Sequence, residues 1–266
     1  MAPQPSIVIV PGSFSFASMY YGLVNKIQEH GYEVFVNNLP SASRNPPEEP
    51  ASMNDDAVFF RGIIENLANQ GKDVLVMTHS YGGLVGTEAV KGVGKAERQA
   101  KGHDGGVVRL VYLTSSVLAE GASTKTERGD PPPELVEMGK DGFMKIVGVE
   151  AVAQGTFPDL ELDKAVEIVK MMPKHSALSF EGQLTYPAYK YIPASYIFCE
   201  NDFIIPPDKQ REYIERIKRE SGKDVDVHTL STGHGPNVTA PGVLANVIVD
   251  IAAKSSAQAA CNIEQG

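Results

Sequence analysis

Short apolar runs alternate with segments of helical spacing along most of this chain. Residues 17–30, 54–71, 82–90 and 207–219 have helical spacing, and a last helix is expected at about 240–253. The runs between them have the length and branched side chains of buried strands: 6–10, 32–36, 74–77, 107–113, 194–199 and 225–230. Strands that alternate with helices predict an α/β fold, with a mostly parallel sheet covered by helices on both faces.

This regularity breaks after Ser116. Residues 118–190 contain Gly-Asp-Pro-Pro-Pro at 129–133 and several short amphipathic pieces, but no convincing strand. We therefore expect a small helical insertion at the carboxyl edge of the sheet, where open α/β folds bind ligands. The predicted organisation is a core made of residues 1–117 and 191–266, interrupted by residues 118–190.

Length and composition narrow the class of protein. A chain of 266 residues can form one α/β domain with an insertion, and its net charge of −9 argues against nucleic acid as a partner. No segment approaches the length of a membrane span, and residues 1–10 lack the pattern of a signal peptide. Cys199 lies in an apolar run and Cys261 in a polar one, so we expect no disulfide and a cytoplasmic protein. Whether the chain forms a homodimer stays open.

Ser80 is the candidate nucleophile. The apolar run 74–77 ends in Thr78-His79-Ser80-Tyr81-Gly82-Gly83, and helical spacing follows. A serine between a buried strand and a helix is typical of the nucleophile elbow, G-x-S-x-G, whose strained turn exposes the hydroxyl above the sheet. Thr78 stands where that pattern has its first glycine. The alternative is an ordinary strand-to-helix connection.

A serine nucleophile requires a base and a group that orients the base. Among the six histidines, only His234 stands in a loop directly after a late strand, between Gly233 and Gly235. Asp202, a few residues beyond the strand at 194–199, is the best carboxylate, and Glu200 is the second candidate. The alternatives are a surface histidine and a capping or solvated carboxylate.

An oxyanion hole would complete such a site. One donor is expected from the backbone amide of Tyr81, which follows the serine. The other is expected from the loop after the first strand, Pro11-Gly12-Ser13-Phe14, through the amide of Ser13.

These features together resemble the α/β-hydrolase superfamily, in the branch that contains plant methyl-ester esterases and hydroxynitrile lyases. The resemblance spans nearly the whole chain, in residues 8–13, 78–83, 192–210 and 233–234, with serine, aspartate and histidine in the family's order. It implies a helical cap at 118–190, inserted after the sixth strand. It also implies Ser80 as nucleophile, His234 as base, Asp202 as orienting acid, and oxyanion donors at Ser13 and Tyr81. No cofactor or metal is implied.

Two residues depart from the family pattern. Pro11-Gly12 replaces a frequent His-Gly, so hydrogen bonds in the oxyanion loop must be rearranged. Gly235 stands where hydroxynitrile lyases have a lysine that stabilises cyanide, which argues against cyanide release.

The predicted function is hydrolysis of a small, largely apolar ester, thioester or lactone through an acyl-enzyme. Four aromatic residues are candidates for the substrate pocket, although each could equally pack the cap onto the sheet: Phe14, Phe143, Phe157 and Phe203. A lyase, a cyclase, a C–C bond hydrolase or a slow small-molecule receptor are alternatives on the same fold. A short-chain dehydrogenase is disfavoured because Pro187 would break the helix that must carry Tyr186 and Lys190.

Overall fold

A computed structural model of the chain describes residues 4–264, and side chains for residues 4–256. At its centre is a six-stranded sheet in the order β2-β1-β3-β4-β8-β9, in which all neighbouring strands are parallel. The predicted α/β class with a parallel sheet is therefore confirmed. The strands are β1 (Ser6–Val10), β2 (Val34–Val36), β3 (Asp73–His79), β4 (Gly106–Leu113), β8 (Ala194–Cys199) and β9 (Asp226–Leu230).

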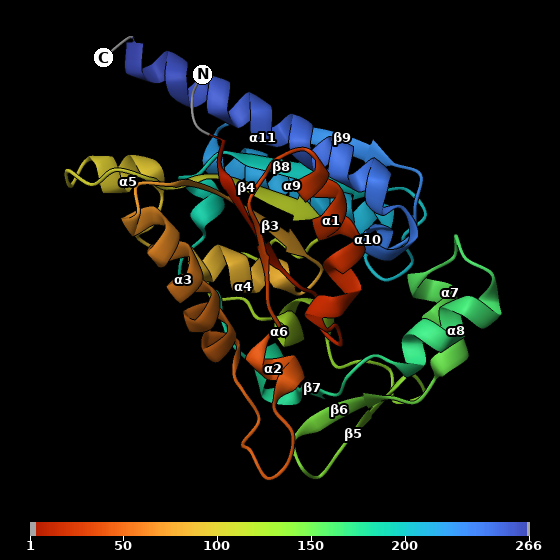
Figure 1. The fold of residues 1–266 in the computed structure, drawn as a ribbon. Helices are drawn as coiled ribbons and strands as arrows, with labels where there is room; N and C mark the ends of the chain where they lie inside the picture. Colours follow the sequence, from red (N-terminus) through yellow and green to blue (C-terminus); the bar gives the residue numbers. More distant parts are fainter. Residues whose placement is uncertain (1–3, 265–266) are drawn as a thin grey trace.

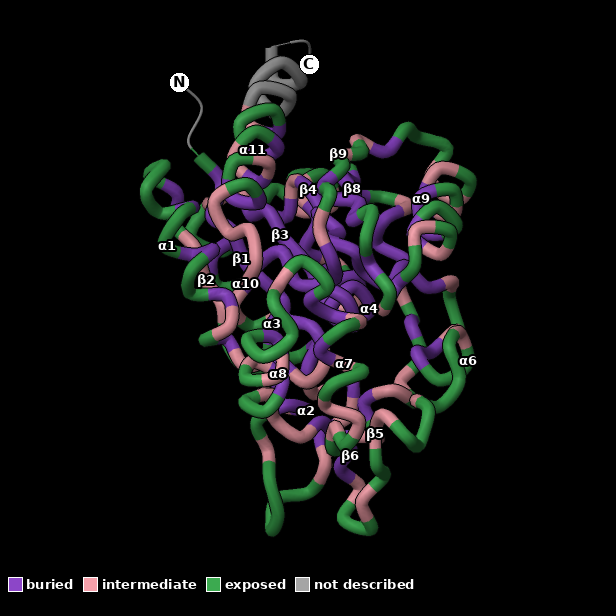
Figure 2. The backbone as a smooth tube through the Cα atoms, turned by 90° about the vertical axis from the view of Figure 1, so that its right-hand side faces the viewer, coloured by how far each residue is buried: buried purple, intermediate pink, exposed green. Residues whose placement is uncertain are grey.

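Helices cover both faces of this sheet (Figure 1). Successive side chains of a strand point to opposite faces, so Ile7 and Ile9 of β1 join one apolar cluster while Val8 and Val10 join the other. Because both faces are buried along the four inner strands, β1, β3, β4 and β8, these strands read as largely apolar runs. Figure 2 shows this burial along the strands. The first face carries α1 (Tyr21–Glu29) and α11 (Pro241–Glu264), and the second carries α3 (Met53–Asn69), α4 (Gly82–Ala89) and α9 (Pro207–Ser221).

Local signals set the ends of these helices. α3 begins after Ser52, whose hydroxyl accepts from the Asp55 amide while the Asp55 carboxylate accepts from the Ser52 amide. α9 begins with Pro207 and ends at Gly222, whose φ of 67° is left-handed and suits glycine.

The segment 118–190 differs from its prediction in two respects. It follows β4, which is the fourth strand of the sheet in chain order and not the sixth. It also contains a three-stranded antiparallel sheet in the order β5-β6-β7, whereas no strand was expected. These strands are too short for an alternating pattern to show in the sequence. The elements are α6 (Thr124–Arg128), β5 (Val136–Met138), β6 (Phe143–Ile146), α7 (Val149–Thr156), α8 (Leu162–Lys170), β7 (His175–Ser176), and the 3₁₀ turns η2 (Ala177–Phe180) and η3 (Ala188–Lys190).

Smaller differences concern the connections. The helix expected at 17–30 begins with a 3₁₀ turn, and the connecting segments 37–52 and 90–105 each contain a short helix that was not expected. No helix in the described part of the chain is long and apolar enough to cross a membrane. Cys199 has a free, buried thiol, and the side chain of Cys261 lies outside the described residues. The remaining short elements are η1 (Ala17–Tyr20), α2 (Pro40–Ser43), α5 (Lys95–Gln99) and α10 (Pro236–Thr239).

Candidate active site

Ser80 occupies a strained turn between β3 and α4. Its φ of 55° is left-handed, which is uncommon for a residue with a side chain. Three donors hold its carbonyl oxygen: the amides of Gly83 and Ser116, each at 3.0 Å, and the Ser115 hydroxyl at 2.9 Å. Such strain persists only where the surroundings enforce it, and it is concentrated at functional sites.

Close packing around the turn explains its glycines. A Cβ atom at Gly82 would lie 2.5 Å from the carbonyl oxygens of both Val10 and Pro11. The turn also shows how Thr78 replaces the first glycine of the G-x-S-x-G pattern. A Cβ atom at Gly86 would lie 2.4 Å from Cγ2 of Thr78, so the glycine on α4 makes room for the threonine methyl group.

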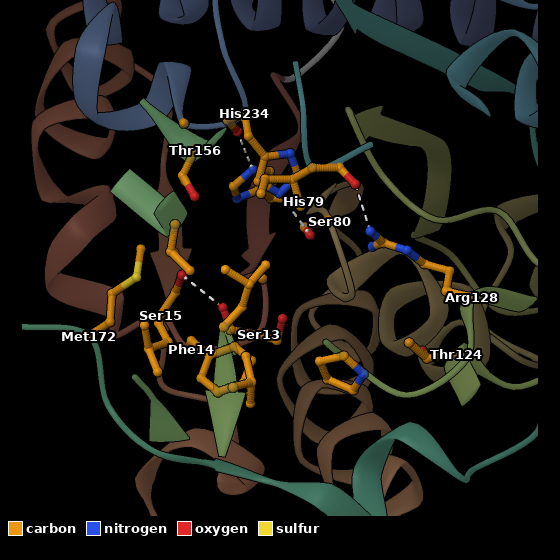
Figure 3. A pocket seen from close by; sticks show the side chains of 18 of the residues that line it. Ser13, Phe14, Ser15, His79, Ser80, Thr124, Arg128, Thr156, Met172 and His234 are labelled. Atoms are coloured by element: carbon orange, nitrogen blue, oxygen red, sulfur yellow. Dashed lines mark hydrogen bonds between the residues drawn. The ribbon is translucent and has the colours of Figure 1, made fainter. Parts of the chain in front are cut away.

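Ser80, His234 and Asp202 form one hydrogen-bonded chain. His234 lies in the loop between β9 and α10; its Nε2 is 2.9 Å from Ser80 Oγ and its Nδ1 is 2.7 Å from Asp202 Oδ2. A carboxylate only accepts, so Nδ1 carries the proton and Nε2 is left to accept one from the serine hydroxyl. All three side chains are buried, and Figure 3 shows His234 directed at Ser80. The three residues selected from the sequence therefore meet in the structure.

The Asp202 carboxylate is held in its charged form. Burial by itself would raise the pKa of Asp202, but the neighbouring His234 and the hydrogen bonds to the carboxylate keep that pKa below its ordinary value. The donors besides His234 are the Thr114 hydroxyl and the amides of Ile204 and Ile205, at 2.7 and 2.9 Å. Glu200, the second candidate, is exposed and accepts from Ser231.

The loop after β1 lies directly against Ser80. A Cβ atom at Gly12 would be 3.1 Å from the Ser80 Cβ. Neither the Ser13 amide nor the Tyr81 amide has an acceptor among the described residues. The next amide, of Phe14, is directed to His175 Nδ1 at 3.5 Å. Both amides therefore remain available as donors, and their role as oxyanion donors stays a prediction.

A second buried chain runs behind His234. His79 Nε2 lies 2.8 Å from the His234 carbonyl oxygen, and its Nδ1 lies 2.7 Å from the Tyr20 hydroxyl. That hydroxyl also accepts from the Gly12 amide at 3.0 Å. His79 and Tyr20 therefore connect the loop after β1 with the backbone of His234.

The serine opens into a cavity of about 250 Å³. Two of the four aromatic candidates, Phe14 and Phe157, line it. Phe143 and Phe203 do not: Phe143 is buried within β6, and Phe203 is 68 % exposed. Phe203 is turned outward because the two amides that follow it fold back onto Asp202. Much of the remaining wall is apolar and includes Met19, Leu135, Val136, Ile146, Val152 and Met172.

The glycines beside His234 allow close contact with segment 118–190. A Cβ atom at Gly235 would lie 2.3 Å from Phe157, and one at Gly233 would lie 2.3 Å from Pro158. Phe157 thereby reaches the cavity wall beside His234.

Several site residues were not identified from the sequence. Tyr20, His79 and His175 are linked to the site through turns that are distant in the chain. Thr114 and Ser115 carried a usable signal: they are small polar residues directly after the buried strand β4, at the carboxyl edge of the sheet. No cluster of three or more histidine, cysteine or acidic side chains within the described residues could hold a metal ion.

Comparisons with known proteins agree with this fold. A family model described as "Alpha/beta hydrolase family" matches residues 7–247. The probable hydrolase R7 of Phoma sp. is 33 % identical over 249 residues, which cover 94 % of this chain and 98 % of R7. A pyrethroid hydrolase structure from Sphingobium faniae JZ-2 superposes with a TM-score of 0.70 at 19 % identity, covering 93 % of this chain and 97 % of its own. The methylesterase MES16 from Arabidopsis gives 0.69 at 16 % identity, covering 94 % and 99 %.

Proposed function

Because the chain belongs to the α/β-hydrolase family, we propose that it is a serine hydrolase that cleaves a small, largely apolar ester, thioester or lactone. The observation that carries this proposal is the chain from Ser80 Oγ through His234 to Asp202, at 2.9 and 2.7 Å, opening into an apolar cavity. The names of two structural neighbours, a pyrethroid hydrolase and a methylesterase, support an ester as substrate.

The proposed reaction is acyl transfer to water. His234 Nε2 takes the Ser80 proton as Oγ attacks the substrate carbonyl carbon, and the amides of Ser13 and Tyr81 donate to the resulting oxyanion. The tetrahedral intermediate expels the alkoxide or thiolate, which receives the proton from His234 and leaves an acyl group on Ser80. His234 then deprotonates a water molecule that attacks this acyl carbon, the bond from that carbon to Ser80 Oγ breaks to release the carboxylic acid, and the proton passes from His234 to Ser80. Asp202 stabilises the imidazolium in both steps.

The proposal extends to the organisation of the chain. Residues 1–117 and 191–266 act as the core that carries the nucleophile, base and acid, and residues 118–190 act as a cap. Support comes from the cavity wall, which combines core residues such as Ser80 with cap residues such as Phe157 and Met172. Substrate selection then belongs mainly to the cap.

Covalent labelling tests the proposal. A fluorophosphonate should label the wild-type protein once, at Ser80, and Ser80→Ala should abolish the label together with hydrolysis of 4-nitrophenyl butyrate, by about 10³-fold or more. Ser231→Ala is the control, because this serine lies in the loop before His234 but is exposed. Turnover by Ser80→Ala at the wild-type rate would refute the serine nucleophile. Stoichiometric labelling without ester turnover would indicate a receptor or a different reaction.

A further inference from the structure

Two polar side chains of the short helix α6 form part of the cavity wall. Thr124 and Arg128 both line the cavity and stand at positions i and i+4, on the same face of α6. Figure 3 shows both on one side of the cavity, across from Met172 and Thr156. The Arg128 side chain extends from α6 toward Ser80 and His234.

Arg128 has no carboxylate partner. One of its N–H groups donates to the Ile204 carbonyl oxygen at 2.6 Å, and among the described residues it forms no ion pair. Lys125, on the same helix, provides the contrast. It does not line the cavity, and its charge is paired with Glu181 at 3.1 Å and Asp130 at 3.8 Å. Asp130 also lines the cavity, but its carboxylate lies 3.8 Å from Lys125 and forms no ion pair with Arg128. Arg128, whose side chain is exposed, is therefore a cation on the cavity wall that no carboxylate of the described residues binds.

Thr124 provides a second, independent observation. It is 6 % exposed, and its Oγ1 has no hydrogen-bond partner among the described residues. Buried hydroxyls nearly always have a partner, so this unpaired one on the cavity wall is available to donate to a ligand. A hydroxyl and a guanidinium one helical turn apart both donate to the same kind of acceptor.

We propose that α6 forms a carboxylate-binding subsite, so that the substrate carries a free carboxylate beside its reactive ester, thioester or lactone group. The identification of that reactive group rests on the proposed function, whereas the subsite rests on Arg128 and Thr124. A guanidinium binds the two oxygens of a carboxylate side by side, and the Thr124 hydroxyl can donate to one of them. Because the whole chain has a net charge of −9, it does not attract anions in general, and their recognition must be local.

A matched pair of substrates tests the subsite. Mono-4-nitrophenyl adipate and 4-nitrophenyl hexanoate have acyl chains of the same length, but only the first ends in a carboxylate. In Arg128→Gln, the ratio of their kcat/KM values should fall about tenfold or more, as expected for the loss of a charge-assisted hydrogen bond. Arg128→Lys should restore the ratio in part. Lys125→Gln, which removes an equal charge from the same helix, should leave both kcat/KM values unchanged.

Binding to a form that cannot turn over separates this inference from the proposed function. Calorimetry on Ser80→Ala should show tighter binding of monomethyl adipate than of methyl hexanoate, and adding Arg128→Gln should remove that preference. If wild type hydrolysed neither activated ester, the serine-hydrolase proposal would fail while calorimetry still decided the subsite. An unchanged preference in Arg128→Gln, or an equal loss in Lys125→Gln, would overturn the carboxylate subsite.

Discussion

Two neighbouring side chains hold the single residue His234 in place, one at its ring and one at its backbone. Asp202 holds its ring, and His79 holds its backbone carbonyl. A carbonyl oxygen only accepts, so the His79 Nε2 carries the proton and its Nδ1 accepts from Tyr20. Burial lowers the pKa of His79 to about 3, with the nearby His234 adding to the effect, so this ring stays neutral at ordinary pH. All hydrogen bonds of this chain therefore point the same way: the Gly12 amide donates to the Tyr20 hydroxyl, which donates to His79 Nδ1. His79 Nε2 donates in turn to the His234 carbonyl oxygen.

Removing the Tyr20 hydroxyl tests this support. In Tyr20→Phe the Gly12 amide loses its acceptor and His79 Nδ1 loses its donor, while the ring stays packed. Because Gly12 precedes the proposed oxyanion donor Ser13, we expect kcat for 4-nitrophenyl esters to fall about tenfold with little change in KM, which corresponds to about 1.4 kcal/mol in activation free energy.

Tyr112→Phe is the matched control. Tyr112 is equally buried, and its hydroxyl bonds to Thr87, away from the cavity. Both variants lose one buried hydroxyl, but only Tyr20→Phe should slow turnover. Equal kcat values in the two variants would show that the chain through His79 contributes to stability alone.

Ser80, Asp202 and His234 could be located from the sequence because each follows a strand, and parallel strands present their carboxyl ends at one edge. Tyr20 and His79 could not be paired in this way. They are 59 residues apart, and their contact depends on how η1 packs against the turn after β3. Phe203 shows the same limit, because its local fold-back onto Asp202 turns an apolar side chain outward.

At the scale of elements, β3 and α4 are fitted to each other at Thr78 and Gly86. The methyl group of Thr78 occupies the space that a side chain at position 86 would need. The departure from G-x-S-x-G thus has its compensation eight residues later, within α4. Sequence pattern alone shows the departure but not the contact that accommodates it.

A double-mutant cycle tests this fit. Gly86→Ala should destabilise the protein by about 1–3 kcal/mol, because the new methyl group would clash with Thr78 Cγ2 at 2.4 Å. In a Thr78→Ser background that methyl group is absent, and the next contacts of the alanine Cβ would be 3.5 Å or longer. There the helix propensity of alanine should stabilise the protein by about 1 kcal/mol, so the sign reverses.

Urea unfolding measures the change in the free energy of unfolding caused by Gly86→Ala, once in wild type and once in Thr78→Ser. Gly62→Ala in α3 is the control, because a Cβ atom there meets nothing within 4 Å and should be stabilising in either background. Destabilisation of the same size by Gly86→Ala in both backgrounds would contradict the proposed fit.

Element length decides how much of the fold could be predicted. Five of the six strands of the central sheet are fully or partly buried on both faces, and their apolar runs mark them clearly; the edge strand β9 exposes one face. β5, β6 and β7 span only two to four residues each, and β6 pairs with β7 across a long stretch of segment 118–190. A pattern of that length cannot distinguish strand from loop.

At the scale of the whole molecule, His175 joins segment 118–190 to the loop after β1. Its Nδ1 accepts from the Phe14 amide, and its Nε2 donates to Ser179 Oγ at 3.0 Å. The rings of Phe14, Tyr81 and Phe180 surround it, with centroids 5.2–5.4 Å away. A neutral histidine is needed there, because a protonated Nδ1 would face the Phe14 amide with two donors and no acceptor.

This junction should make the protein sensitive to acid. Burial lowers the pKa of His175 from 6.5 to about 3. Between these values the unfolded chain binds a proton that the folded protein does not, so the free energy of unfolding falls as pH falls from 6.5 toward 3. From pH 7 to pH 5 this one group accounts for a loss of about 2 kcal/mol.

Urea unfolding of His175→Gln at the two pH values isolates that loss. The variant starts less stable at pH 7, because the glutamine packs less well among the three rings, but its loss between pH 7 and pH 5 should be about 2 kcal/mol smaller than that of wild type. His103→Gln, in the exposed segment before β4, should lose as much as wild type. The same pH dependence in wild type and His175→Gln would mean that this histidine titrates alike in the folded and unfolded protein. The contact between segment 118–190 and the loop after β1 would then open to water at urea concentrations below the unfolding transition.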